Sequence, residues 1–103
     1  MKIFRLHPKE NKMDDVNWQA STSKKPMVVR AVDENRARRI AALVCGIAVE
    51  RGNPSQITPV NPWSKVMQLG DCVELEQYSY PLEGEEEILE PEYLNDELNR
   101  KKL

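Results

Sequence analysis

The chain has 103 residues, of which 40% are hydrophobic and 31% charged, and its net charge is −2. A chain of this length forms one domain with a modest core, and its composition is that of a water-soluble folded protein. Its longest apolar run, residues 40–49, has about half of the roughly 20 residues that span a bilayer, and the N-terminus lacks an apolar signal region. We therefore expect a cytoplasmic protein without a membrane segment.

The net charge conceals a division along the chain. Residues 1–70 hold 12 basic and 6 acidic side chains, whereas residues 71–103 hold 3 basic and 11 acidic ones. Such an asymmetry has two simple outcomes. The acidic end either folds back over the basic part or extends into solvent as a solubilising tail.

A strand and a polar loop are predicted at the N-terminus. Side chains alternate along residues 2–7, with Phe4 and Leu6 on one face, and this period is typical of a strand. Residues 9–25 are polar and predict a loop. Trp18 stands out in this loop, where a large apolar side chain most often anchors the loop to the core. Contact with a partner protein is the alternative for Trp18.

A second strand and the main helix follow. Residues 27–32 are mostly β-branched and predict a strand. The Asp33 carboxylate is placed to accept hydrogen bonds from the first turn of a helix. This helix is expected to run over about residues 33–51, and Gly52 is suited to end it.

The predicted helix is apolar on more than one side. One stripe with helical spacing, suited to packing on a sheet, is made of Ala37, Ile40, Ala41, Val44, Ile47 and Ala48. Leu43 and Cys45 extend the apolar surface beyond this stripe. A small sheet cannot cover all of it, so we expect a loop, the tail or a second chain to cover the rest.

The remaining elements are less regular. Residues 53–63 contain three prolines and predict an extended connection, with Trp63 packed over the helix. Residues 71–78 alternate and predict a third strand, with Val73 facing inward. Residues 81–103 are acidic and broken by proline and glycine, and they predict a flexible or conditionally helical tail.

Together these elements predict an α+β fold. We expect a small antiparallel or mixed sheet of three or four strands, one main helix packed on it, and an acidic C-terminal extension. The compact domain is expected over residues 1–80 and the tail over residues 81–103. A short helix in this tail, with Leu94 and Leu98 four residues apart, would need a surface on which to lie.

The sequence offers no pattern of catalytic or metal-binding residues. His7 is the one histidine, and Cys45 and Cys72 belong to no cluster with the spacing of metal ligands. The four glycines are scattered and form no phosphate-binding loop. We therefore expect no catalytic residue, no metal site and no cofactor, and we expect a protein that is not an enzyme. The two cysteines are expected to be free structural thiols.

Four arginines gather around the start of the predicted helix: Arg30, Arg36, Arg38 and Arg39. The favoured interpretation is a solvated rim with local ion pairs, each worth less than about 1 kcal/mol. An anion-binding corner that contacts a phosphate backbone is the second interpretation. In the third, the acidic residues between 83 and 92 dock on these arginines, within one chain or across a dimer.

The sequence favours a non-enzymatic protein–protein interaction module, such as a bacterial or phage-type adaptor, inhibitor or antitoxin-like protein. Its partner would be another protein or a second copy of itself, bound through the apolar helix surface and the acidic tail. The residues predicted to bind this partner are Trp18, Trp63, Tyr93, Leu94 and Leu98. The alternative is a nucleic-acid-binding module that uses the four arginines, although the chain lacks the interleaved aromatic side chains of such surfaces.

Overall fold

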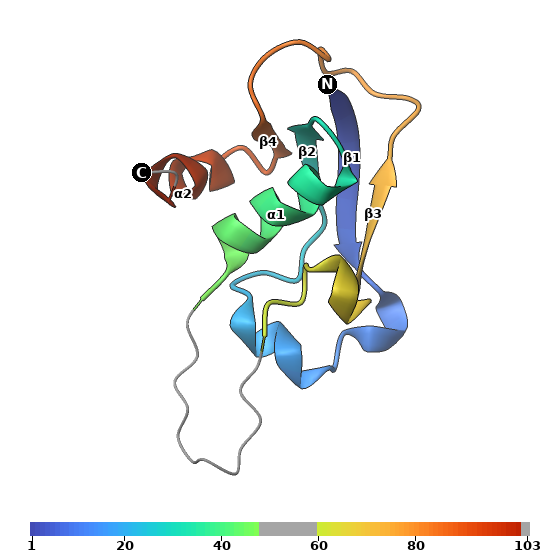
Figure 1. Ribbon diagram of the computed structural model, residues 1–103, viewed down its shortest axis with the longest axis vertical. Helices are drawn as coiled ribbons and strands as arrows, with labels where there is room; N and C mark the ends of the chain where they lie inside the picture. Colours follow the sequence, from blue (N-terminus) through green and yellow to red (C-terminus); the bar gives the residue numbers. More distant parts are fainter. Residues whose placement is uncertain (48–59, 102–103) are drawn as a thin grey trace.

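A computed structural model gives the fold of the chain and describes residues 1–47 and 60–101. One antiparallel sheet has the strand order β3-β1-β2-β4 (Figure 1). Its strands are β1 (Lys2–Pro8), β2 (Met27–Ala31), β3 (Gly70–Glu74) and β4 (Glu87–Glu90). The described residues also form two α-helices, α1 (Glu34–Cys45) and α2 (Leu94–Lys101), and three 3-10 turns, η1 (Glu10–Lys12), η2 (Val16–Ala20) and η3 (Lys65–Met67). The predicted α+β class, with an antiparallel or mixed sheet of three or four strands, is confirmed, and the sheet has four antiparallel strands and two helices.

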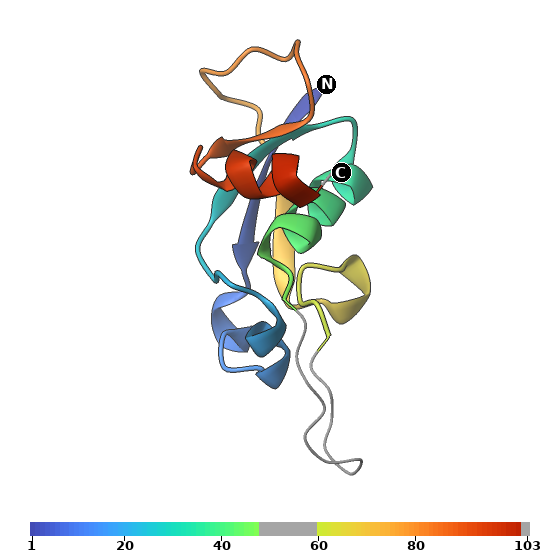
Figure 2. The ribbon, with the colours of Figure 1, turned by 90° about the vertical axis from the view of Figure 1, so that its left-hand side faces the viewer.

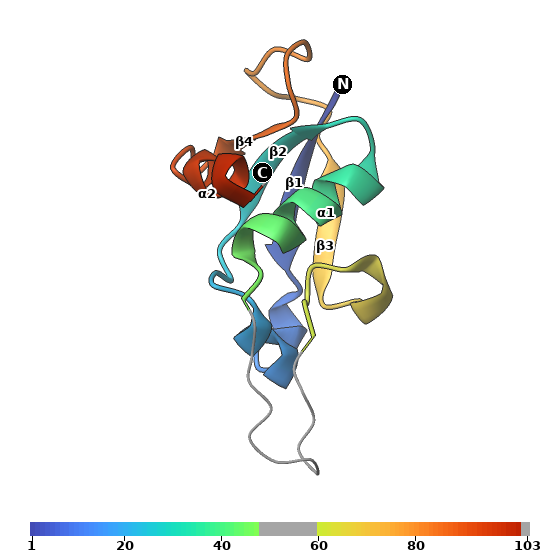
Figure 3. The same cartoon turned by 60° about the vertical axis from the view of Figure 1, so that its left-hand side comes forward.

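Both helices cover the same face of the sheet. α1 packs on β1, β2 and β3, and α2 packs on α1 and β4. Figure 2 shows α1 on one side of the strands, and Figure 3 shows α2 beside α1 and next to β4. The core lies between these layers and includes Phe4, Leu6, Val29 and Ile88. No helix of the described residues is long and apolar enough to cross a membrane.

The register of β3 differs from the prediction. β1 pairs Leu6 with Cys72 and Arg5 with Val73. Directly paired residues of antiparallel strands share a face of the sheet, so Cys72 faces the core beside Leu6. Val73 lies on the opposite face and is 49% exposed. The prediction that Val73 points inward is therefore wrong.

α1 begins as predicted and ends earlier. The Asp33 carboxylate accepts a hydrogen bond from the Arg36 amide at 2.8 Å. After Cys45 the backbone of Gly46 is extended, and a Cβ atom at this glycine would lie 2.5 Å from the Ala42 oxygen. The side-chain nitrogen of Asn61 donates to that same oxygen at 2.8 Å. A residue distant along the chain therefore supplies the hydrogen bond that the next turn of the helix would otherwise make. The expected helix end at residue 52 and most of the connection expected over 53–63 lie outside the described residues.

The acidic C-terminal extension is not confirmed as a separate tail. β4 pairs with β2, with Ile88 opposite Val29, and Ile88 is fully buried. Leu94 and Leu98 of α2 are buried in the same core as the sheet. The predicted short helix needs a surface on which to lie, and α1 and β4 supply it, while β4 itself pairs with the edge of β2.

Candidate functional site

The two tryptophans predicted as partner contacts lie inside the molecule. Trp18 and Trp63 are almost completely buried, and their rings meet edge to face with centroids 5.2 Å apart. The indole nitrogen of Trp18 donates to the Lys12 oxygen, and that of Trp63 donates to Ser21 Oγ, both at 3.0 Å. Of the two interpretations of Trp18, the structure therefore supports the anchor, since a buried ring offers no surface to a partner.

The other three residues predicted to bind a partner do not share one surface. Leu94 and Leu98 are buried against α1 and the sheet. Tyr93, at the start of the last helix, is 67% exposed. Of the five residues, only Tyr93 is therefore available to another molecule in this structure.

Arg30 is buried and fully engaged. Its exposed fraction is only 5%, on the inner strand β2 between β1 and β4. Its guanidinium donates to the oxygens of Glu85 and Pro81 at 3.0 and 3.1 Å and forms an ion pair with Glu87. Gly84 passes so close that a Cβ atom there would lie 2.7 Å from Arg30 Nη2. Arg30 therefore fastens the segment before β4 and is not part of an open anion site.

Arg36 is also paired with an acidic residue of the C-terminal segment. Its Nη2 and Nε atoms donate to Glu86 Oε1 at 2.7 and 3.1 Å. This hydrogen bond and the charge of Glu86 raise the pKa of Arg36 above its usual value. The third interpretation, in which the acidic residues dock on the arginines within one chain, is thus confirmed for Arg30 and Arg36.

The Arg38 side chain is partly buried, and its guanidinium contacts both backbone oxygens and the Glu34 carboxylate. Its Nη1 atom donates to the oxygens of Trp63 and Gly70 at 3.3 and 3.1 Å, and its Nη2 atom lies 3.7 Å from Glu34. Its Nε atom is buried and has no hydrogen-bond partner in the described part of the chain. Arg38 thereby holds η3 and the start of β3 against α1.

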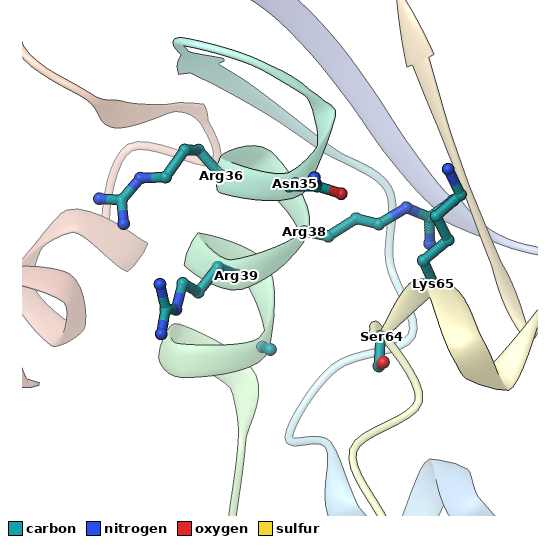
Figure 4. Close-up of a pocket in the computed structure, with 7 residues that line it drawn as sticks. Asn35, Arg36, Arg38, Arg39, Ser64 and Lys65 are labelled. Carbon is teal, nitrogen blue, oxygen red and sulfur yellow. The ribbon is translucent and has the colours of Figure 1, made fainter.

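The exposed side of α1 and the neighbouring η3 turn form a cavity of about 400 Å³, which we call the basic pocket (Figure 4). Its lining consists of Asn35, Arg36, Arg38, Arg39, Ala42, Ser64 and Lys65. In the view of Figure 4, Arg38 extends toward Lys65, whereas Arg36 and Arg39 extend from the opposite flank of the helix. Four basic residues therefore contribute to the lining, with the Arg38 and Lys65 side chains on one flank of α1 and those of Arg36 and Arg39 on the other.

Acidic groups neutralise this pocket only in part. Glu34 lies 3.7 Å from Arg38 and 3.4 Å from Lys65, so one carboxylate is shared by two cations. Glu86 pairs with Arg36. Arg39 is exposed and makes no ion pair with another described residue. The four basic residues of the lining thus face two carboxylates, and Arg39 is the one that makes no ion pair with a described residue.

The arginines of the pocket were predicted from the sequence, but Ser64 and Lys65 were not. Ser64 and Lys65 reach the pocket from a turn that is distant along the chain, and no local pattern links them to α1. The one local signal is that Ser64 and Gly70 bracket a short segment suited to a turn, which places Lys65 next to a chain reversal.

The remaining chemically reactive side chains do not form a site. Cys45 and Cys72 are free, and burial raises the pKa of both thiols, that of Cys72 to about 12. His7 Nε2 lies 3.5 Å from Asp71 at the surface of the sheet. Within residues 1–47 and 60–101, no three metal-ligating side chains come together.

No protein-family model, curated protein or solved structure matches the chain. The functional argument therefore starts from the basic pocket itself.

Proposed function

We propose that the protein is a non-enzymatic protein–protein interaction module whose basic pocket receives a carboxylate-rich segment of a partner protein. The observation that supports this most directly is that Arg39, an exposed residue of the pocket lining, makes no ion pair with another described residue. The two free cysteines are compatible with a reducing compartment, and we propose that the protein is cytoplasmic.

The chemistry of the pocket suits carboxylates. Guanidinium groups bind carboxylates through paired, charge-assisted hydrogen bonds. The protein's own chain supplies a precedent, since the Glu86 carboxylate accepts hydrogen bonds from Nε and Nη2 of Arg36 on the same helix. An isolated surface ion pair contributes less than about 1 kcal/mol, so a partner segment needs several carboxylates to bind.

A nucleic acid fits the pocket less well. The lining contains no aromatic side chain on which a base could stack. The carboxylates of Glu34 and Glu86, which pair with Arg38 and Arg36 of α1, would repel a phosphate backbone. An acidic peptide meets the same repulsion, but its separate carboxylates can be placed around these groups, whereas a duplex presents a continuous line of charge.

Calorimetry with an acetylated and amidated hexaglutamate peptide tests the proposal. We expect the double variant Arg39→Ala/Lys65→Ala to bind this peptide about tenfold more weakly than the unchanged protein, since it loses two ion pairs. The matched control is Arg5→Ala/Lys25→Ala, which removes the same charge from exposed positions outside the pocket. Its affinity should fall much less.

Two outcomes would overturn the proposal. Equal losses in the two double variants would mean that hexaglutamate responds to net charge and not to the pocket. Tighter binding of a 20-base-pair DNA duplex than of hexaglutamate at the same salt concentration, with the same dependence on Arg39 and Lys65, would favour the nucleic-acid alternative.

A further inference from the structure

A second, smaller cavity adjoins the basic pocket on the flank of α1 that faces α2. It has a volume of about 200 Å³ and is lined by Arg36, Arg39, Ile40, Leu43 and Leu98. Arg36 and Arg39 line both cavities. A ligand that binds Arg39 in the basic pocket therefore lies next to the smaller cavity.

The smaller cavity combines an apolar floor with a basic rim. Its residues on α1 follow the spacing i, i+3, i+4 and i+7, so they share one flank of the helix. Ile40 and Leu98 are buried and form the floor, whereas Leu43 is 40% exposed. Arg36 and Arg39 extend together from this flank (Figure 4). Among the described residues, no side chain covers Leu43 completely.

We propose that the partner segment carries a large apolar side chain next to its carboxylates. The apolar side chain enters the cavity between α1 and α2, while a neighbouring carboxylate binds Arg39. This inference rests on the proposed function and specifies the partner that the pocket takes. A cavity of about 150 Å³ holds a benzene ring, so one of about 200 Å³ has room for a phenylalanine or leucine side chain.

The protein's own C-terminal segment follows the same pattern. Glu86 binds Arg36 at the rim of the cavity, and Ile88, two residues later, is fully buried in the core. Within the protein's own chain, the acidic residue that binds Arg36 is thus followed closely by an apolar residue, which packs in the core beside the cavity residues Ile40 and Leu98 and does not line the cavity itself. Charge complementarity selects a peptide of this kind over an uncharged apolar ligand, because such a ligand would leave Arg39 without a partner.

Two peptides that differ at one position test the inference. Calorimetry compares acetyl-EEEEEE-amide with acetyl-EEEFEE-amide, and we expect the second to bind at least about tenfold more tightly, because its aromatic ring leaves water. The variant Leu43→Ser should lose most of this gain and keep its affinity for hexaglutamate. The control Val66→Ser removes a more exposed apolar side chain, 86% exposed on η3, and should keep the gain.

A second measurement does not depend on variants. In the unchanged protein, nuclear Overhauser contacts should join the phenylalanine ring to the methyl groups of Ile40, Leu43 and Leu98. The inference is wrong, and the proposed function stands, if hexaglutamate binds but the phenylalanine peptide binds no more tightly. The same holds if the gain in affinity from phenylalanine is unchanged in Leu43→Ser. If neither peptide binds, the proposed function fails and the inference fails with it.

Discussion

Arg30 binds three groups of the segment that precedes β4, two of them backbone oxygens and the third the Glu87 carboxylate. We expect Arg30→Met to lower the free energy of unfolding by about 2–4 kcal/mol, because it leaves these acceptors without their buried donor. Urea denaturation measures this loss. The matched change Arg5→Met, at an exposed position of the neighbouring strand, should stay within about 0.5 kcal/mol.

One result would contradict the prediction for Arg30→Met. Equal stability of Arg30→Met and Arg5→Met would mean that the hydrogen bonds to Pro81 and Glu85 hold nothing in place. The accompanying structural sign is proteolysis, which should open the chain near residues 81–86 in Arg30→Met before it does so in Arg5→Met.

At the residue scale the sequence located the basic cluster but not the role of each member. Arg30 and Arg39 looked equivalent, yet Arg30 is 5% exposed and engaged, whereas Arg39 has no partner in the described ranges. The difference arises from acidic residues that are more than 45 positions away along the chain, such as Glu86 and Glu87. Contacts over that separation depend on strand pairing, which local patterns do not specify.

At the element scale, β4 is an edge strand whose outer side is closed by a single side chain. Asn95 Oδ1 accepts from the Ile88 amide at 2.8 Å, and Asn95 Nδ2 donates to the Ile88 oxygen at 2.6 Å. The Asn95 side chain thus pairs with the Ile88 N–H and C=O groups as a neighbouring strand would. Unpaired groups of this kind make an exposed sheet edge prone to association. The four-residue strand depends on this contact as well as on β2.

We therefore expect Asn95→Ala to destabilise the protein by about 1–3 kcal/mol, because a buried backbone donor and acceptor lose their partner. Amide hydrogen exchange at Ile88 should become faster, and thermal unfolding should shift to a lower temperature. The control is Asn99→Ala, one turn later on the same helix at an exposed position. Unchanged exchange at Ile88 in Asn95→Ala would show that the side chain does not protect the edge.

The elements that the sequence predicted well are those with a local pattern. β1 and β2 alternate or are β-branched, and α1 begins at a capping aspartate that the structure confirms. β4 escaped prediction because the run Glu87–Glu90 has only two apolar residues and becomes a strand by pairing with β2. The end of α1 escaped it because a distant asparagine, Asn61, binds the last turn.

At the scale of the whole molecule, the C-terminal segment binds both ends of α1. Glu86 accepts from the Val32 amide at 3.3 Å and from Arg36, near the positive end of the helix dipole. Lys101 Nζ donates to the oxygens of Leu43 and Gly46 at 3.0 and 3.1 Å, at the negative end. Both placements complement the dipole. Ion pairs between the two parts of the chain therefore neutralise some of the charge asymmetry along the sequence.

This arrangement leaves the basic pocket without an acidic residue of the C-terminal segment beside Arg39 in the described part of the chain. The acidic residues that fold back reach Arg30 and Arg36, on the side of α1 toward β4. They do not pair with Arg39 or with Lys65, which lie around the basic pocket together with the single carboxylate of Glu34. Among the four arginines around α1, Arg39 is the one without an ion pair to a described residue, and the proposed function depends on it.

The most direct test is a nuclear magnetic resonance titration of the unchanged protein with the acetylated hexaglutamate peptide. We predict that backbone amide shifts change in residues 35–43 of α1 and at Ser64 and Lys65, while those of the sheet face around Arg5 stay constant. Shifts spread evenly over all basic residues, or shifts absent from α1 at peptide concentrations that saturate binding, would contradict the account.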